Sequence, residues 1–420
     1  MATELGDSMK LDLIETLADL VRIPSVNPMG SNPVAGQNAS EAGRDIYYEA
    51  RLTEHLAQLL GTLGLPIARQ TVEILPDGSR RENLLARLDG TPSLDEGGEL
   101  MLWEVHQDTV PVDGMTVDPF GAEVRDGKLF GRGACDVKGG MAAMLVALAR
   151  LCEQRPPQMP TIVLALTVNE EHGFSGARQL VRGFEEGTEP LLPRAPDVCV
   201  VAEPTNLDVV VAHKGVVRWN CHTRGRAVHS SQPELGENAI YRMAEVVTLL
   251  QEYSEEVVPT LATHARCGRP TMSVGTIAGG AGVNIVPETC RVAIDRRLVP
   301  GETPEKAYEH AVEFVRAGVA GGWQVEHDRP FIESPGLSDE ANGPLAERLS
   351  QMARDVGGRG EIVGVPYGTD AAIVAVSGVP AVVFGPGSIE QAHTADEWID
   401  LEQLDRASEI YYQLAAGRLE

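Results

Sequence analysis

Residues 161–184 read TIVLALTVNEEHGFSGARQLVRGF, which places an apolar run, a polar loop and a helical pattern in direct succession. The run at 161–168 is continuously apolar, as is typical of a strand buried on both faces of a parallel sheet. A second run of this kind, DVCVVA, occupies residues 197–202. Alternation of buried strands with helices predicts an α/β domain with a largely parallel sheet.

The same alternation continues on both sides of this stretch. Upstream, we expect helices at 9–22, 50–63 and 139–152 and strands at 83–88 and 99–105. After about residue 213 the pattern changes to half-exposed strands at 216–224, 271–278 and 289–298 and helices at 238–252 and 304–317. Near residue 328 the first pattern returns, with a helix at 343–356, a strand at 381–384 and a last helix from Leu401. The sequence therefore predicts one domain of residues 1–212 and 328–420, interrupted by a smaller α+β domain of residues 213–327.

Length and charge narrow the class of protein. A chain of 420 residues is too long for one compact core, so two domains are expected. Lys and Arg number 35 and Asp and Glu 61, a formal net charge of −26, which argues against nucleic acid or an anionic membrane surface as a partner. We expect no membrane span and no signal peptide. The six cysteines are scattered without CxxC pairs, which favours a reducing cytoplasm.

Five polar motifs follow strands or precede helices of the predicted α/β domain, where ligands of such sheets bind. They contain His106 and Asp108, Asp136, the pair Glu170 and Glu171, Glu203, and His393. Two adjacent carboxylates repel each other unless a cation or a raised pKa relieves the repulsion. Imidazoles and carboxylates together suit Zn²⁺, Co²⁺ or Mn²⁺. Taken singly, each motif also fits a hydrogen-bonded pair, a glycine-rich turn or a solvated acidic loop.

Taken in order, the motifs from Arg22-Ile23-Pro24-Ser25 to Trp398 resemble those of the dinuclear-zinc amidohydrolases and peptidases. That family includes acetylornithine deacetylase, succinyl-diaminopimelate desuccinylase, aminoacylase-1 and the glutamate carboxypeptidases. The resemblance implies an α/β catalytic domain with a mostly parallel mixed sheet flanked by helices. It also implies an inserted α+β, ferredoxin-like lid or dimerisation domain. Two divalent metal ions are expected, zinc in the first place, with cobalt or manganese as alternatives.

The resemblance also implies a role for each motif residue. Asp136 matches the carboxylate that bridges both metals, and the bond from Asp136 to Val137 is expected to be cis. His106 and Glu203 match the ligands of one metal, and Glu171 and His393 match those of the other. Glu170 matches the general base, and Asp108 matches the acid that orients His106. Glu104 and Val105 depart from the small residues usual before the first histidine, and His172 departs from an apolar residue; we expect neither change to alter the ligands.

Residues of the insert match family positions that contact the substrate. His229, in the segment Ala227-Val228-His229-Ser230-Ser231, matches a histidine that reaches the partner subunit's active site and holds the oxyanion. Asn284 matches a substrate-binding asparagine, and Arg297 matches an arginine that grips a substrate carboxylate. Gly368 and Thr369 look like part of a loop that lines the site. Each of these residues also fits ordinary surface or turn chemistry.

The resemblance thus predicts a homodimeric hydrolase that cleaves the amide bond of small N-acyl amino acids, and the cysteine pattern places it in the cytoplasm. A metallo-carboxypeptidase or dipeptidase acting on short peptides is the alternative within the family, because it would use the same metals and base. A non-catalytic binding protein with this fold is the alternative from another class. It would be expected to lose ligands or the base, whereas all of these positions are filled here.

Overall fold

The chain divides into two units in the computed structural model, which describes residues 11–30 and 46–417. The larger unit comprises Met1–Val211, Asp339–Val363 and Thr369–Glu420, and the smaller comprises Ala212–Ser338 and Gly364–Gly368. The second boundary of the smaller unit lies beyond residue 328, because strand β13 (Ile332–Ser334) still pairs with β9 (Gly215–Arg224) of that unit.

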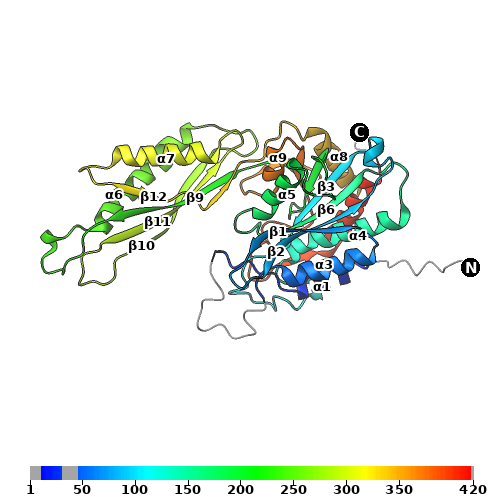
Figure 1. The fold of residues 1–420 in the computed structure, drawn as a ribbon, viewed down its shortest axis with the longest axis horizontal. Coiled ribbons are helices and arrows are strands. Elements are labelled where there is room, and N and C mark those ends of the chain that lie inside the picture. The colour runs from blue at the N-terminus through cyan, green and yellow to red at the C-terminus, as the bar shows by residue number, and fades with distance from the viewer. Residues whose placement is uncertain (1–10, 31–45, 418–420) are drawn as a thin grey trace, which may run out of the picture. The chain divides into compact units, whose positions relative to one another are not determined.

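An eight-stranded mixed sheet forms the centre of the larger unit (Figure 1). The order of its strands is β1 (Ile67–Ile74), β2 (Arg80–Leu88), β6 (Thr161–Thr167), β3 (Leu100–His106), β7 (Val198–Val201), β15 (Ala381–Val383), β8 (Val209–His213) and β14 (Ile362–Val365). The four middle strands β6, β3, β7 and β15 run parallel, and β1, β2 and β8 run antiparallel to their neighbours. The predicted fold class is therefore confirmed.

Helices cover both faces of this sheet. On one face, α4 (Gly139–Gln154) packs against α1 (Leu13–Arg22) and α10 (Leu401–Ala415), and α10 also packs against α8 (Gly343–Asp355). On the other, α5 (Ser175–Glu185) packs against α9 (Ala371–Val376), and both contact strands of the sheet. Helix α3 (Ala50–Thr62) packs on β1 and β2, and a small separate sheet holds β4 (Glu123–Arg125), β5 (Lys128–Phe130) and β16 (Trp398–Asp400).

Side-chain caps fix where several helices begin. The carboxylate of Asp12 accepts a hydrogen bond from the Glu15 N–H at the start of α1, and Asp400 does the same for Gln403 at the start of α10. In the smaller unit, Asn238 caps α6 (Ala239–Glu252) and Thr303 caps α7 (Pro304–Gly318). Such caps satisfy N–H groups that have no partner within the helix, so the polar residue before each apolar pattern sets its first turn.

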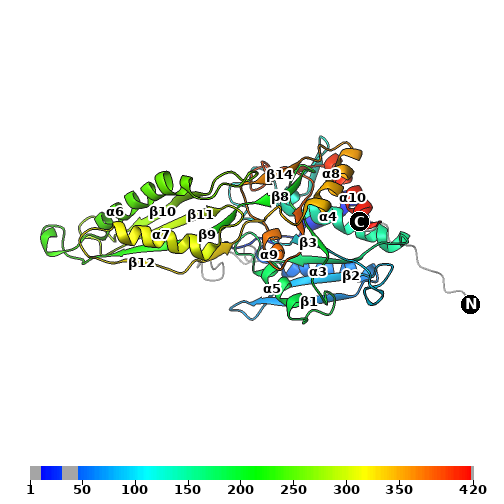
Figure 2. The same cartoon turned by 90° about the horizontal axis from the view of Figure 1, so that it is seen from above.

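The smaller unit has the βαββαβ order of a ferredoxin-like fold. Its strands β9, β10 (Thr271–Gly279), β11 (Thr289–Leu298) and β12 (Val325–His327) lie in the order β10-β11-β9-β12, and β13 extends the edge beside β9. Helices α6 and α7 pack against each other and cover one face of this sheet (Figure 2). Its core is a separate apolar cluster centred on Trp219, Tyr253 and Val292.

None of the helices in the described part of the chain combines the length and the apolar composition that a bilayer span requires.

We expect the buried hydroxyl of Tyr411 to stabilise the larger unit. It donates to the Phe384 carbonyl at 2.6 Å, and its ring lies 5.7 Å from that of Trp103. Tyr411→Phe leaves this carbonyl buried without its donor, which should lower the free energy of unfolding by about 1–3 kcal/mol.

The neighbouring Tyr412→Phe is the matched control, because its hydroxyl donates to Gln154 at the surface. Its urea midpoint should stay close to that of the wild type. Equal midpoints for the two variants would contradict the role given to Tyr411.

Candidate active site

The five sequence motifs meet at one edge of the large sheet. His106 is the last residue of β3, Glu170 and Glu171 follow β6, and Glu203 follows β7. Because these three strands are adjacent and parallel, their carboxyl ends lie at the same edge. Asp136 is buried in the turn of Ala134–Lys138 that leads into α4, and its bond to Val137 is cis, as expected. His393 comes from the loop before β16.

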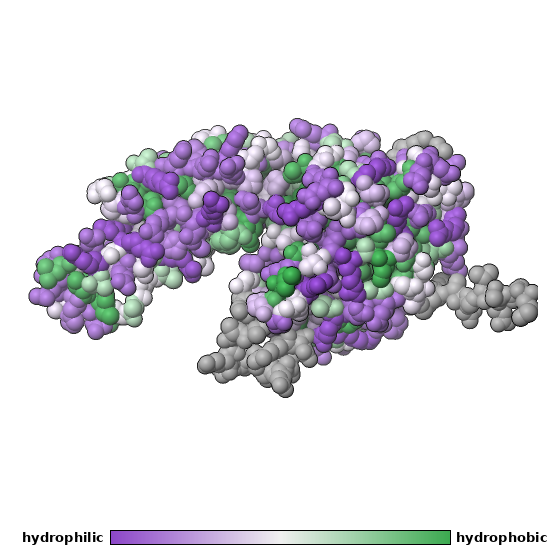
Figure 3. Space-filling model, viewed as in Figure 1, coloured by the Kyte–Doolittle hydropathy of each residue, from purple (hydrophilic) through white to green (hydrophobic). Residues whose placement is uncertain are grey.

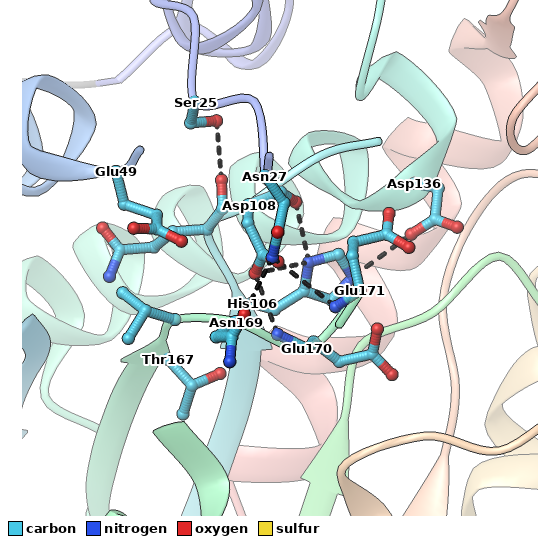
Figure 4. A network of polar contacts seen from close by, with 12 residues as sticks. Ser25, Asn27, Glu49, His106, Asp108, Asp136, Thr167, Asn169, Glu170 and Glu171 are labelled. Atoms are coloured by element: carbon cyan, nitrogen blue, oxygen red, sulfur yellow. Dashed lines mark hydrogen bonds and ion pairs between the residues drawn. The ribbon is translucent and has the colours of Figure 1, made fainter. Parts of the chain in front are cut away.

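Asp136 lies between the two histidines. Its Oδ1 is 3.2 Å from Nε2 of His106, and its Oδ2 is 3.3 Å from Nε2 of His393. Each histidine has a glutamate beside it: Glu203 Oε1 lies 3.8 Å from His106 Nε2, and Glu171 Oε2 lies 3.2 Å from His393 Nε2. Figure 4 shows the side chains of His106, Asp136, Glu170 and Glu171 gathered at this edge.

This donor set fits metal ions. His106, Asp136 and Glu171 can bring ligand atoms within 4.8 Å of one another, and so can His106, Glu170 and Glu203. Nitrogen and carboxylate oxygen are the ligands that Zn²⁺, Co²⁺ and Mn²⁺ accept. One carboxylate placed between two histidine–glutamate pairs offers ligands to two neighbouring cations. Glu170 lies with Glu203 and His106, next to the ligands that the resemblance implies.

The pKa values of these groups show how crowded the negative charge is. Burial, together with the nearby carboxylate of Glu203, raises the pKa of Glu170 well above its usual range. Burial and Asp136 do the same to the pKa of Glu203. His393 is half exposed; partial loss of solvent opposes its charge, but its hydrogen bonds to Asp136 and Glu171 raise its pKa to about 11. The imidazoles thus partly neutralise a cluster that cations would neutralise better.

Asp108 lies closer to His106 through its main-chain oxygen than through its carboxylate. We expected its carboxylate to orient His106, but the Nδ1 of His106 lies 2.9 Å from the main-chain oxygen of Asp108 and 3.7 Å from the carboxylate Oδ1. The carboxylate instead accepts hydrogen bonds from the backbone N–H groups of Glu170 and Glu171, at 3.1 and 3.2 Å. Asp108 therefore holds the main chain that carries the expected base and one expected ligand.

A polar network behind Asp108 was not found from the sequence (Figure 4). The amide of Asn27 donates to Asp108 at 2.8 Å and to Asn169 at 2.9 Å. Asn169 also accepts from Arg81, which is buried and paired with the buried Glu49. The residues come from separate parts of the chain, and each is an ordinary polar residue in its own segment. The sequence carried no signal that would have joined them.

Glu104 forms a close pair with a second buried carboxyl group. It lies buried on β3 beside the buried Asp370, and the Thr167 hydroxyl lies within hydrogen-bond distance of both carboxyl groups. Burial and Asp370 raise the pKa of Glu104 well above its usual range, and burial raises the pKa of Asp370 to about 6. Two carboxyl groups so placed favour a state in which they hold one proton between them.

His172 lines a cavity of about 320 Å³ together with Asn27, Tyr48 and Arg81.

The expected substrate residues of the insert lie at two ends of the smaller unit. Exposed His229 and Asn284 are neighbours at one end, where the N–H of Ser230 donates to the Asn284 carbonyl at 3.0 Å. Arg297 lies near the other end of β11, paired with Val216 and bonded through Nε to Asp295 at 2.7 Å. Most of β11 lies between them, roughly 25 Å at the rise of an extended strand. Gly368 approaches the Lys214 carbonyl, and Thr369 is buried next to Asp370.

Comparison with known proteins gives consistent results. The model of "Peptidase family M20/M25/M40" matches residues 102–417. Acetylornithine deacetylase of Myxococcus xanthus is 31% identical over 87% of this chain and 91% of its own length. The same enzyme of Proteus mirabilis is 34% identical over 96% of this chain and 95% of its own length.

A solved structure shares the fold. A dinuclear metal-binding peptidase of the M20 family from Bacillus subtilis superposes with a TM-score of 0.65 and 18% identity, covering 96% of each chain. The chain belongs to peptidase family M20/M25/M40 and is a metal-dependent hydrolase.

Proposed function

We propose that this chain hydrolyses the amide bond of small N-acyl amino acids, with an acetylornithine-like compound as the leading substrate. The placement of Asp136 between two histidine–glutamate pairs, next to Glu170, carries the proposal of amide hydrolysis. The substrate class rests on relatives named acetylornithine deacetylase that align along nearly the whole chain.

Two divalent cations, zinc in the first place, fit this arrangement. Asp136 would be shared between them, His106 and Glu203 would hold one, and His393 and Glu171 would hold the other. When bound, such a pair polarises the carbonyl of an amide and lowers the pKa of a water molecule.

Glu170 is the base in this proposal. Its carboxylate takes a proton from the water that attacks the carbonyl carbon, and it returns a proton to the nitrogen as the C–N bond breaks. The products are a carboxylate from the acyl group and the free amine of the amino acid. Asp108 keeps Glu170 in place, since it binds the backbone N–H of this residue.

A homodimer completes the proposed site. His229 and Asn284 lie at the far end of β11 from Arg297, so one copy of the smaller unit cannot gather all three around one small substrate. In the proposed dimer, His229 and Asn284 come from the partner subunit, where His229 donates to the oxyanion and Asn284 contacts the substrate. Arg297 binds the substrate carboxylate, and Gly368 and Thr369 line the site.

Exposed apolar side chains support an association through the smaller unit. Figure 3 shows hydrophobic residues gathered at one end of this unit. The large exposed apolar side chains on or beside α6, β10 and the turn before β11 are Leu235, Ile240, Tyr241, Ile277, Val283 and Ile285, close to the segment that carries His229. An exposed group of this kind is typical of a protein interface.

The buried thiols of Cys135, Cys199 and Cys221 support a reducing compartment such as the cytoplasm.

The first test is the release of amine after chelation and reloading with Zn²⁺ or Co²⁺. The panel contains N-acetylornithine, N-succinyl-diaminopimelate, simple N-acetyl amino acids, N-acyl glutamates and dipeptides. We expect metal-dependent turnover of an N-acyl amino acid, with N-acetylornithine first. Turnover of dipeptides alone would overturn the substrate class and favour the peptidase alternative.

Glu170→Gln should separate the base from the ligands. The variant should bind two metal equivalents as the wild type does, yet its turnover should fall by at least about 100-fold, the usual contribution of a general base. Glu171→Gln is the matched control, because it should lose metal as well as turnover. Full activity of Glu170→Gln would refute its role as the base.

Mixed dimers test the shared site. His229→Ala should be nearly inactive, because losing one oxyanion donor typically costs about 3–4 kcal/mol. Glu170→Gln should be nearly inactive because it lacks the base. After subunit exchange, a mixed dimer holds one site in which both residues are native, so activity should return. His222→Ala, at another histidine of the same unit, should keep its activity. Exchange shown by mass spectrometry without any recovery would exclude a shared site.

A further inference from the structure

Glu397 is a buried carboxylate that joins two segments of the candidate active site. It lies four residues after His393 in the chain, and its side chain is fully buried. Its Oε1 accepts hydrogen bonds from the backbone N–H groups of Cys135 and Asp136, at 2.9 and 3.0 Å. Its Oε2 accepts from the Gly133 N–H at 3.1 Å and from Arg132 at 2.5 Å.

Further contacts between the same two segments strengthen this link. The N–H of Gly131 donates to the main-chain oxygen of Glu397 at 3.0 Å. Arg132 donates to the carbonyl of Thr394 at 3.4 Å as well as to Glu397. The loop that carries Asp136 and the loop that carries His393 are thus tied together through both the main chain and the side chain of Glu397.

The loop that carries His393 needs such support because of its backbone. His393 has a φ of 62°, in the left-handed region that is unfavourable for a residue other than glycine. A residue other than glycine keeps such a conformation where the surrounding contacts enforce it. Gly133, three residues before Asp136, has a φ of 82°, which glycine adopts without strain. The contacts of Glu397 lie on both loops, within four residues of each of these positions.

All acceptor positions of the Glu397 carboxylate are in use. Each oxygen receives two donors, and an ionised carboxylate has about four lone-pair sites. Glu397 therefore has no lone pair left for a metal ion or a substrate. Its effect on the chemistry must pass through Asp136 and His393.

We propose that Glu397 is a positioning residue that fixes Asp136 relative to His393 and thereby sets the affinity for both metal ions. The proposal rests on the metal centre proposed above, and it assigns Glu397 no part in the chemical step. Because Asp136 would be shared by both ions, a displaced Asp136 loop weakens both of them and not one alone. Residues that orient metal ligands typically contribute 10- to 100-fold to metal affinity or activity.

Two substitutions separate charge from geometry. Glu397→Gln has nearly the same shape, but either orientation of its amide turns an NH₂ group toward N–H donors. Glu397→Asp keeps the charge but is one methylene shorter, so it cannot keep all four hydrogen bonds. Glu302→Gln is the matched control. Like Glu397, Glu302 pairs with a buried arginine, Arg296, and accepts a hydrogen bond from a backbone N–H, that of Val299 at 2.8 Å. Glu302 lies in the smaller unit, away from the candidate ligands.

The experiment titrates chelator-treated full-length protein with Zn²⁺ against a competing chelator, and with Co²⁺ while the visible spectrum is recorded. For Glu397→Gln we expect the affinity of both sites to fall by about 10- to 100-fold, with a changed Co²⁺ spectrum. Glu397→Asp should fall between this variant and the wild type. Glu302→Gln should bind both metals as the wild type does, even where its unfolding temperature is lower.

The outcomes separate this inference from the proposed function. If both Glu397 variants bind Zn²⁺ within twofold of the wild type with an unchanged Co²⁺ spectrum, Glu397 is merely structural and the inference is overturned. The inference is also overturned if the variants lose affinity no more than Glu302→Gln does. If the wild type itself binds no metal pair, it is the proposed metal centre that fails. Should Glu397→Gln not fold, Glu397→Asp carries the same comparison.

Discussion

The concentration of carboxylates at one edge of the large sheet is the constraint on which the site depends. Glu170, Glu171 and Glu203 meet Asp136 there, in surroundings where burial disfavours their charge. The imidazoles of His106 and His393 face them, and Asp136 receives one at each of its oxygens. Such a cluster is stable when cations neutralise it. The same crowding that opposes folding of the bare site therefore favours the binding of metal ions to it.

The chain holds this cluster in place with carboxylates that are not ligands themselves. Asp108 binds the backbone N–H groups of Glu170 and Glu171, and Glu397 binds those of Cys135 and Asp136. In both cases the acceptor is fully buried, and the donors belong to main chain that carries a candidate ligand or base. Backbone N–H groups cannot change rotamer, so a bond to them fixes the loop itself. Charge at the site and the position of the loops are thus controlled by different residues.

Sequence reasoning found several parts of the fold that follow from apolar periodicity, although it missed the buried strand β8. The apolar runs at 161–168 and 197–202 correspond to β6 and β7, and the helical pattern at 139–152 corresponds to α4. Strand β1 was missed because it lies at the sheet edge with most of its side chains exposed, so it lacks an apolar pattern. His106, Glu170, Glu171 and Glu203 could be named because a histidine or a carboxylate at the end of a buried strand is a visible signal, and Asp136 and His393 could be named because their motifs resemble those of a family.

The contacts of Asp108, Glu104 and Glu397 could not be predicted from the sequence. Each depends on a partner far away in the sequence: Asn27 for Asp108, Asp370 for Glu104, and the 132–136 segment for Glu397. The acceptor roles of Asp108 and Glu397 are also filled largely by backbone N–H groups, which every residue except proline offers. A motif records which side chains are present, but the direction of a backbone N–H is decided by the folded loop.

The dimensions of the smaller unit bear on the dimer proposed above. Asn284 and Arg297 are joined by the turn before β11 and by the strand itself, so their separation is set by an extended backbone that cannot shorten. A small N-acyl amino acid spans far less than this strand. If both residues contact one substrate molecule, they must come from two copies of the chain. The apolar side chains beside His229 would then serve catalysis as well as assembly. They would hold the second copy so that its Asn284 reaches the substrate bound by Arg297 of the first copy.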